Sequence, residues 1–254
     1  MGFIKPARDS WLHTNGRLSV YINIASSTKL SKLMEITMLC FPLASTWARI
    51  EYPQLGSLPS IILFIYIFLV LKYFHAYSAD VFFERSDDLL TAGNFTESIE
   101  LINNAVKRNP NEPLYYRGRA KSYISATVGQ DTTTERTLRE LALADLEKAY
   151  SLNPKNYATI RNSVPLYYFL AIDDLGRPGS SDNVDPEFLP YTKDYYNKVE
   201  RLVGNDVGIY VLLAKYQNKL GLKEDLKRSV NKITELRPDL LNWHESLRDL
   251  DVSL

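Results

Sequence analysis

Residues 82–110, FFERSDDLLTAGNFTESIELINNAVKRNP, carry the pattern that decides the fold. Bulky and small residues alternate at fixed spacing around a glycine, and a proline closes the segment. The positions are Phe82, Ser86, Leu89, Gly93, Ser98, Ile102, Ala105 and Pro110. This spacing predicts a hairpin of two amphipathic helices, because small residues let the helices cross closely and proline ends the second one.

The closing proline recurs at Pro154 and Pro238. Counting back from Pro238 on the same frame gives a looser match at Tyr210, Ala214, Gln217, Gly221, Leu226, Val230 and Ile233. Over residues 76–254 the chain therefore resembles the tetratricopeptide repeat family, whose period is about 34 residues. The resemblance implies an all-α solenoid of stacked helical hairpins, about four repeats in all. An irregular helical bundle is the alternative.

Two of the repeats are predicted to carry insertions. The first insertion is Ser125–Arg136, a polar run between the helices of the second repeat, and the second is Gly176–Pro186, which is rich in turn formers. Pro165 is expected to interrupt the first helix of the third repeat. The second helix of that repeat is expected at Tyr191–Leu202, on the apolar pattern of Tyr195, Tyr196, Val199 and Leu202.

Three helix starts have recognisable capping signals. Asn94 with Glu97, and Thr132 with Glu135, have the spacing of a capping box. An asparagine two residues before Pro113 is typical of a helix entry. These signals predict helices that begin near residues 95, 113 and 133.

An apolar run precedes the repeats. Leu55–Phe74 holds one charged residue, Lys72, at its end, and is long enough to cross a bilayer. A buried core helix would need a partner surface that is apolar on all sides, which amphipathic repeats do not offer. We therefore expect a transmembrane helix. A shorter run, Leu33–Ala48, within an N-terminal segment at 1–54, is expected to be a marginal membrane helix, an interfacial segment or the remnant of a larger membrane domain.

Charge is balanced over the chain and uneven along it. The chain has 30 basic and 30 acidic residues. Positions 1–74 hold seven Lys and Arg against three acidic residues, which predicts a single-pass membrane protein with a cytoplasmic N-terminus and extracytoplasmic repeats. In the two-span alternative, in which Leu33–Ala48 also crosses, both termini lie on the same side of the membrane. Positions 75–254 hold 23 basic against 27 acidic residues, which argues against nucleic-acid binding.

The sequence carries no motif of a known catalytic site. It has no phosphate-binding glycine loop, no zinc-protease motif and no serine-hydrolase motif. His13, His75 and His244 are far apart, and Cys40 is the sole cysteine. We therefore predict no catalytic residue, no metal and no cofactor.

A second resemblance covers residues 55–125. Ala76–Asp80, Gly93–Phe95 and Ala105–Tyr116, placed after an apolar span, are similar to the extracytoplasmic tail of bacterial O-antigen ligase and polymerase proteins. This resemblance implies a part of a glycan-assembly protein. The external loop that carries those enzymes' catalytic residues is missing here, so no catalytic residue is transferred.

The repeat frame predicts which side chains face the concave groove formed by the first helices. They are Phe83, Asp87, Leu90, Arg117, Lys121, Arg161, Tyr168, Lys215 and Lys219. Five of them are cations, and aromatic residues flank them. We expect a noncatalytic membrane-anchored scaffold whose groove binds a protein or peptide partner, through an acidic segment or a C-terminal carboxylate, or binds an anionic glycan intermediate. Ordinary solvated helix residues are the alternative.

Overall fold

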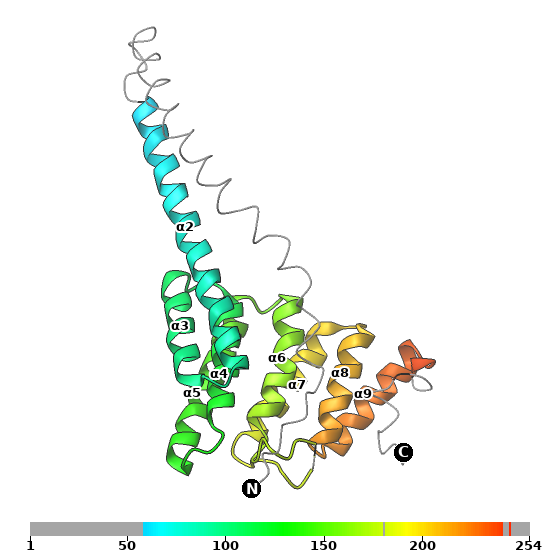
Figure 1. Cartoon of the computed structure of the whole chain (residues 1–254). Helices are drawn as coiled ribbons and strands as arrows, with labels where there is room; N and C mark the ends of the chain where they lie inside the picture. The colour runs from blue at the N-terminus through cyan, green and yellow to red at the C-terminus, as the bar shows by residue number, and fades with distance from the viewer. Residues whose placement is uncertain (1–57, 180, 241–243, 245–254) are drawn as a thin grey trace. The chain divides into compact units, whose positions relative to one another are not determined.

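The computed structural model describes residues 58–179, 181–240 and 244. These residues form eight α-helices and no β-strand, which confirms the predicted all-α class (Figure 1). The helices are α2 (Leu58–Thr91), α3 (Phe95–Arg108), α4 (Pro113–Ala126), α5 (Thr132–Leu152), α6 (Tyr157–Leu170), α7 (Leu189–Val203), α8 (Val207–Lys219) and α9 (Lys223–Leu236). The predicted N-terminal segment at 1–54, its marginal helix at 33–48 and the first three residues of the predicted span lie outside the described residues.

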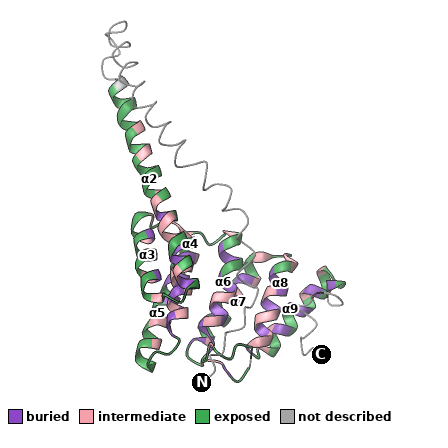
Figure 2. Ribbon diagram, in the orientation of Figure 1, coloured by how far each residue is buried: buried purple, intermediate pink, exposed green. Residues whose placement is uncertain are grey.

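The chain divides into two compact units, residues 1–72 and 73–254, and α2 contributes to both. Within the described part of the first unit, α2 exposes large apolar side chains such as Phe64 and Leu69, at 74% and 58%. Figure 2 shows this half of the helix as exposed. From Ser60 to Thr91 the helix is long and apolar enough to cross a membrane.

In the second unit each helix packs on its neighbours in sequence. From α3 to α9, every helix contacts the one that follows it, and α4 also packs on α6, as α6 does on α8. The C-terminal half of α2 joins the same unit, because the Ser98 hydroxyl on α3 donates to the Ser86 carbonyl at 2.8 Å. The described helices therefore pack in chain order from α3 to α9, with the C-terminal half of α2 beside α3 (Figure 1).

Small side chains are buried at the predicted close crossings. Ala105, Ala149 and Ala214 are fully buried, and so is Ser98. Figure 2 shows buried residues along the sides of α4 to α9 that face neighbouring helices. A larger side chain at these positions would force the helix axes apart.

Two tight turns between successive helices depend on glycine. Gly93 between α2 and α3, and Gly221 between α8 and α9, have φ values of 84° and 68°. Glycine adopts this left-handed conformation without the steric penalty of a Cβ atom. Both glycines were predicted as turn positions from the repeat frame.

The sequence predicted the first residues of these helices to within one or two positions, but it did not predict which side chains cap them. Asn94 is the N-cap of α3 without a side-chain hydrogen bond. Asp131, not Thr132, caps α5 by accepting from the backbone N–H groups of Thr133 and Thr134. Glu112 caps α4 by accepting from the Leu114 N–H at 3.1 Å. A carboxylate next to the expected residue therefore takes the capping role twice.

The first predicted insertion is mostly helix. Only residues 127–131 separate α4 from α5. The remaining inserted residues lengthen α5, which has 21 residues against 14 in α3. The prediction of a polar loop was wrong here because the capping carboxylate of Asp131 starts the helix early.

Pro165 does not interrupt α6, contrary to the prediction. Proline removes one backbone donor, which leaves the carbonyl of Arg161 without its helical partner, but Arg161 is exposed to solvent. The adjacent carbonyls of Ile160 and Val164 accept hydrogen bonds from the hydroxyls of Tyr195 and Tyr196, at 3.0 and 3.1 Å. Packing of α7 on α6 therefore stabilises the helical backbone around Pro165. The predicted second helix at Tyr191–Leu202 is confirmed as α7, although Leu202 is 45% exposed.

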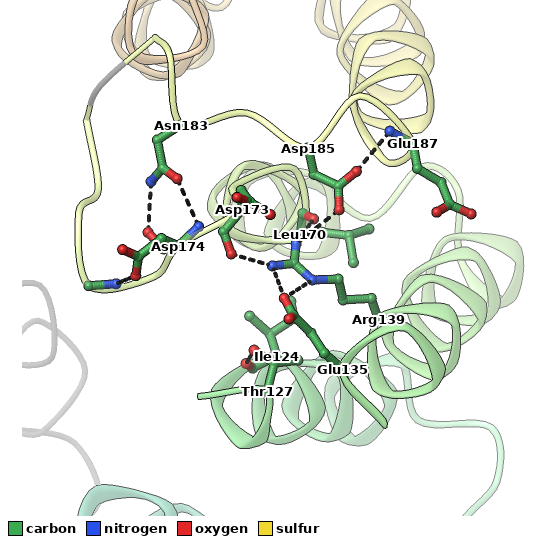
Figure 3. A network of polar contacts seen from close by, with 11 residues as sticks. Ile124, Thr127, Glu135, Arg139, Leu170, Asp173, Asp174, Asn183, Asp185 and Glu187 are labelled. Atoms are coloured by element: carbon green, nitrogen blue, oxygen red, sulfur yellow. Dashed lines mark hydrogen bonds and ion pairs between the residues drawn. The ribbon is translucent and has the colours of Figure 1, made fainter. Parts of the chain in front are cut away.

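The second insertion lies between α6 and α7, and a buried arginine fixes its position (Figure 3). The Arg139 guanidinium of α5 donates to the carbonyls of Leu170 and Asp173, both at 2.8 Å. It also donates to the Glu135 carboxylate, at 2.6 and 2.9 Å. Its charge therefore lies at the carboxyl end of α6, where the helix dipole favours a cation.

Candidate partner-binding surface

The predicted groove residues come from the first helix of each predicted repeat. The surface that they form, called here the A-helix surface, consists of Phe83, Asp87 and Leu90 of α2, Arg117 and Lys121 of α4, Arg161 and Tyr168 of α6, and Lys215 and Lys219 of α8. Neighbouring first helices are in contact, since α4 packs on α6 and α6 on α8. The structure therefore arranges these side chains on adjacent helices, in three groups of different character.

The first group joins α2 to α4. Phe83 lies against Tyr115, with ring centroids 5.4 Å apart, and Leu90 is buried. Lys121 forms an ion pair with Asp87 at 2.8 Å, so its charge is balanced within the chain. These four residues mainly hold α4 on α2.

Arg117 stands apart from this group. Its side chain is nine-tenths buried, at 9% exposure, and its Nε has no hydrogen-bond acceptor. No ion pair joins its guanidinium to any residue that the structure describes. Burial lowers the pKa of Arg117, and the nearby Tyr195 and Glu112 oppose this effect only in part. A buried guanidinium without a carboxylate is costly, and a ligand carboxylate would satisfy it.

The last group lies on α6 and α8. The Lys219 Nζ lies 5.6 Å from the centroid of the Tyr168 ring, and the Lys215 Nζ lies 5.7 Å from that of Tyr216. The two tyrosine rings are 4.8 Å apart. Tyr168 itself is 1% exposed and packs in the core, so this group offers an acidic peptide the two half-buried lysines rather than an open aromatic face.

Arg161 is exposed on α6 and makes no hydrogen bond or ion pair with the described part of the chain. It lies close enough to Tyr157 to influence the pKa of that phenol, which burial and Asp206 raise. The A-helix surface thus offers two arginines without a carboxylate partner, one buried and one exposed.

Sequence reasoning missed the contrast between Arg117 and Arg119. Arg119 lies on the same helix and forms two hydrogen bonds with the Asp145 carboxylate of α5, both at 2.7 Å. It also donates to Asn103 at 2.8 Å. No signal in the sequence distinguishes the paired arginine from the unpaired one, because the partner lies 26 residues away along the chain.

Within residues 58–179 and 181–240, no three side chains of His, Cys, Asp or Glu gather in a way that could hold a metal ion. Comparison of the chain with models of known protein families and with curated proteins finds no match.

Proposed function

We propose that this chain is a membrane-anchored adaptor of the tetratricopeptide repeat type, and that its A-helix surface binds an acidic segment or C-terminal carboxylate of a partner protein. The observation that carries the proposal is Arg117, a buried guanidinium without a partner. A carboxylate there would form a bidentate, charge-assisted pair in a partly desolvated setting, where such pairs are strongest.

The burial pattern supports the repeat assignment. In the last pair, Tyr210, Ala214 and Gln217 of α8 are buried, as are Leu226, Val230 and Ile233 of α9. In the first pair, Ser86, Ser98, Ile102 and Ala105 occupy the equivalent positions and are buried as well. Stacked helical hairpins of this kind act by presenting the surface of their first helices to a partner.

The exposed apolar half of α2 supports a membrane anchor. Apolar side chains that no protein surface covers are stable in a bilayer. Because basic residues are in excess before the span, we propose that the chain crosses the membrane once and that the repeats lie outside the cytoplasm. Labelling of a Ser151→Cys variant in a Cys40→Ser background by an impermeant thiol reagent in intact cells tests this. Protection of that cysteine would contradict the topology.

Selection of peptides tests the binding proposal. A library of random peptides with free C-termini is panned on the full chain in lipid nanodiscs. We expect enrichment of acidic or carboxylate-terminated sequences on the wild type, and loss of that enrichment on Arg117→Met. Equal enrichment on both proteins, or a preference for basic peptides that Arg117→Met leaves unchanged, would contradict the proposal.

The other candidate, a part of a glycan-assembly protein, stays a prediction from the resemblance of residues 55–125. No contact among the described residues favours it over peptide binding.

A further inference from the structure

A pocket of about 200 Å³ lies between α5 and α7, with one side chain of α6 in its wall. Four tyrosine rings line it: Tyr150 of α5, Tyr167 of α6, and Tyr191 and Tyr195 of α7. The pocket shares no residue with the A-helix surface. We call it the tyrosine pocket.

Contacts among the rings keep the tyrosine pocket in shape. Tyr167 and Tyr195 are stacked, with centroids 4.0 Å apart and planes 12° apart. Tyr150 meets Tyr195 edge to face, at 6.2 Å. The Tyr195 hydroxyl is fixed by donating to the Ile160 carbonyl at 3.0 Å. A preformed wall of this kind lowers the entropy cost of binding a ligand.

The charge of the tyrosine pocket is negative. Glu147 of α5 and Asp194 of α7 line it, together with Lys198. Lys198 pairs with Asp194 at 2.6 Å, whereas Glu147 makes no hydrogen bond or ion pair with the described residues. One carboxylate is therefore left unbalanced. Burial raises the pKa of Tyr167, and the nearby Tyr195, Glu147 and Asp194 contribute.

We propose that the tyrosine pocket receives the cationic side chain of an arginine or lysine from a protein partner, held by the tyrosine rings and by the Glu147 carboxylate. Aromatic faces attract cations within about 6 Å, and the attraction grows where water is excluded. The chain already uses this chemistry at Lys219 and Tyr168. This site shares no residue with the A-helix surface, although Arg117 lies near Tyr195, and it prefers a ligand of the opposite charge.

Small probes of matched shape test the proposal. The full chain in nanodiscs is titrated with Nα-acetyl-arginine amide and, in parallel, with Nα-acetyl-citrulline amide, its neutral isostere, and with glucose. Saturation-transfer NMR reports binding of each. We expect the arginine derivative to bind and the two neutral probes to bind at least about fivefold more weakly, since the charge term of a partly exposed pair reaches about 1 kcal/mol.

Two variants with opposite expected effects sharpen the test. Glu147→Gln removes the unpaired carboxylate and should weaken binding of the arginine derivative about fivefold. Lys198→Met removes the internal cation that competes for Asp194 and should strengthen binding, which no loss of folding can imitate. Glu100→Gln, an equal charge change at an exposed site on α3, should leave binding unchanged.

Equal binding of the arginine and citrulline derivatives would overturn the proposal, and so would tighter binding of glucose. Absence of any binding, or an unchanged affinity in both Glu147→Gln and Lys198→Met, would overturn it as well.

Discussion

Replacing Arg117 by methionine should make the protein more stable in the absence of a ligand. Most substitutions of buried residues destabilise a protein, but this side chain is 9% exposed and its Nε has no acceptor. An unsatisfied buried donor costs about 1–3 kcal/mol, and methionine occupies much of the same space without a charge. Because methionine will not pack perfectly in this space, we expect the free energy of unfolding to rise by only about 1 kcal/mol.

Arg119→Met is the matched control on the same helix. It removes the bidentate partner of Asp145, whose side chain is 8% exposed, and leaves that carboxylate buried and unpaired. Breaking a buried ion pair in this way costs about 3 kcal/mol. The two variants should therefore differ by about 4 kcal/mol, with opposite signs relative to the wild type.

Thermal unfolding of the full chain in detergent micelles, followed by circular dichroism, measures both effects. For a domain of this size, about 1 kcal/mol corresponds to a shift in Tm of about 2–4 °C. Arg117→Met should melt a few degrees above the wild type, and Arg119→Met clearly below it. A fall in Tm for Arg117→Met comparable with that of Arg119→Met would refute the reasoning, because it would mean that the Arg117 guanidinium has a partner within the chain.

Three further predictions concern packing, the buried arginine and pH. Gly118→Ala should lower the free energy of unfolding by about 1–2 kcal/mol, although alanine is the better helix former. The added Cβ would lie 2.5 Å from Phe83 Cε2 and 2.8 Å from Ile102 Cδ1. A variant that proves more stable in a urea titration would contradict the packing of α2 and α3 on α4. Arg139→Met should cost about 3 kcal/mol in the same titration, against less than about 1 for the exposed Arg136→Met, and equal losses would contradict the role of the network in Figure 3. Burial raises the pKa of Tyr216 to about 12, so the folded state keeps a proton that the unfolded chain releases near the ordinary tyrosine pKa of 10.0. Stability should therefore be constant below that value and fall as the pH rises from 10 toward 12, less steeply in Tyr216→Phe, and urea midpoints that do not change over this range would contradict the assignment.

The helices themselves were predictable because they depend on spacing along the chain. Positions such as Ser98, Ala105 and Gly93 combine small size or backbone freedom with a fixed interval, and the structure buries the first two and gives the third a positive φ. The capping and insertion errors were local, because a neighbouring carboxylate takes the capping role, whereas the error at Pro165 arose where a contact from another helix decides the outcome. Pro165 is tolerated because Tyr195 and Tyr196 reach the carbonyls around it from α7.

The candidate sites were predictable only in part, for the same reason. The repeat frame selected Arg117 and Lys121 equally, but Asp87 pairs with the second and no carboxylate pairs with the first. The tyrosine pocket escaped prediction because its rings come from three helices, and each ring alone has the pattern of an ordinary core residue. Arg139 and Glu135 have the spacing of an exposed ion pair, yet the arginine side chain is 3% exposed.

The central claim, that the A-helix surface binds an acidic segment of a partner, is tested most directly by photo-crosslinking in intact cells. A benzoylphenylalanine replaces Leu114, which is 37% exposed on α4 three residues before Arg117, and in a control it replaces the exposed Asn104 of α3. We expect an adduct from position 114 alone, mapped by mass spectrometry to an acidic or C-terminal segment of one partner, and its loss in the Arg117→Met background. Adducts that persist in that background, or that form equally from position 104, would contradict the claim.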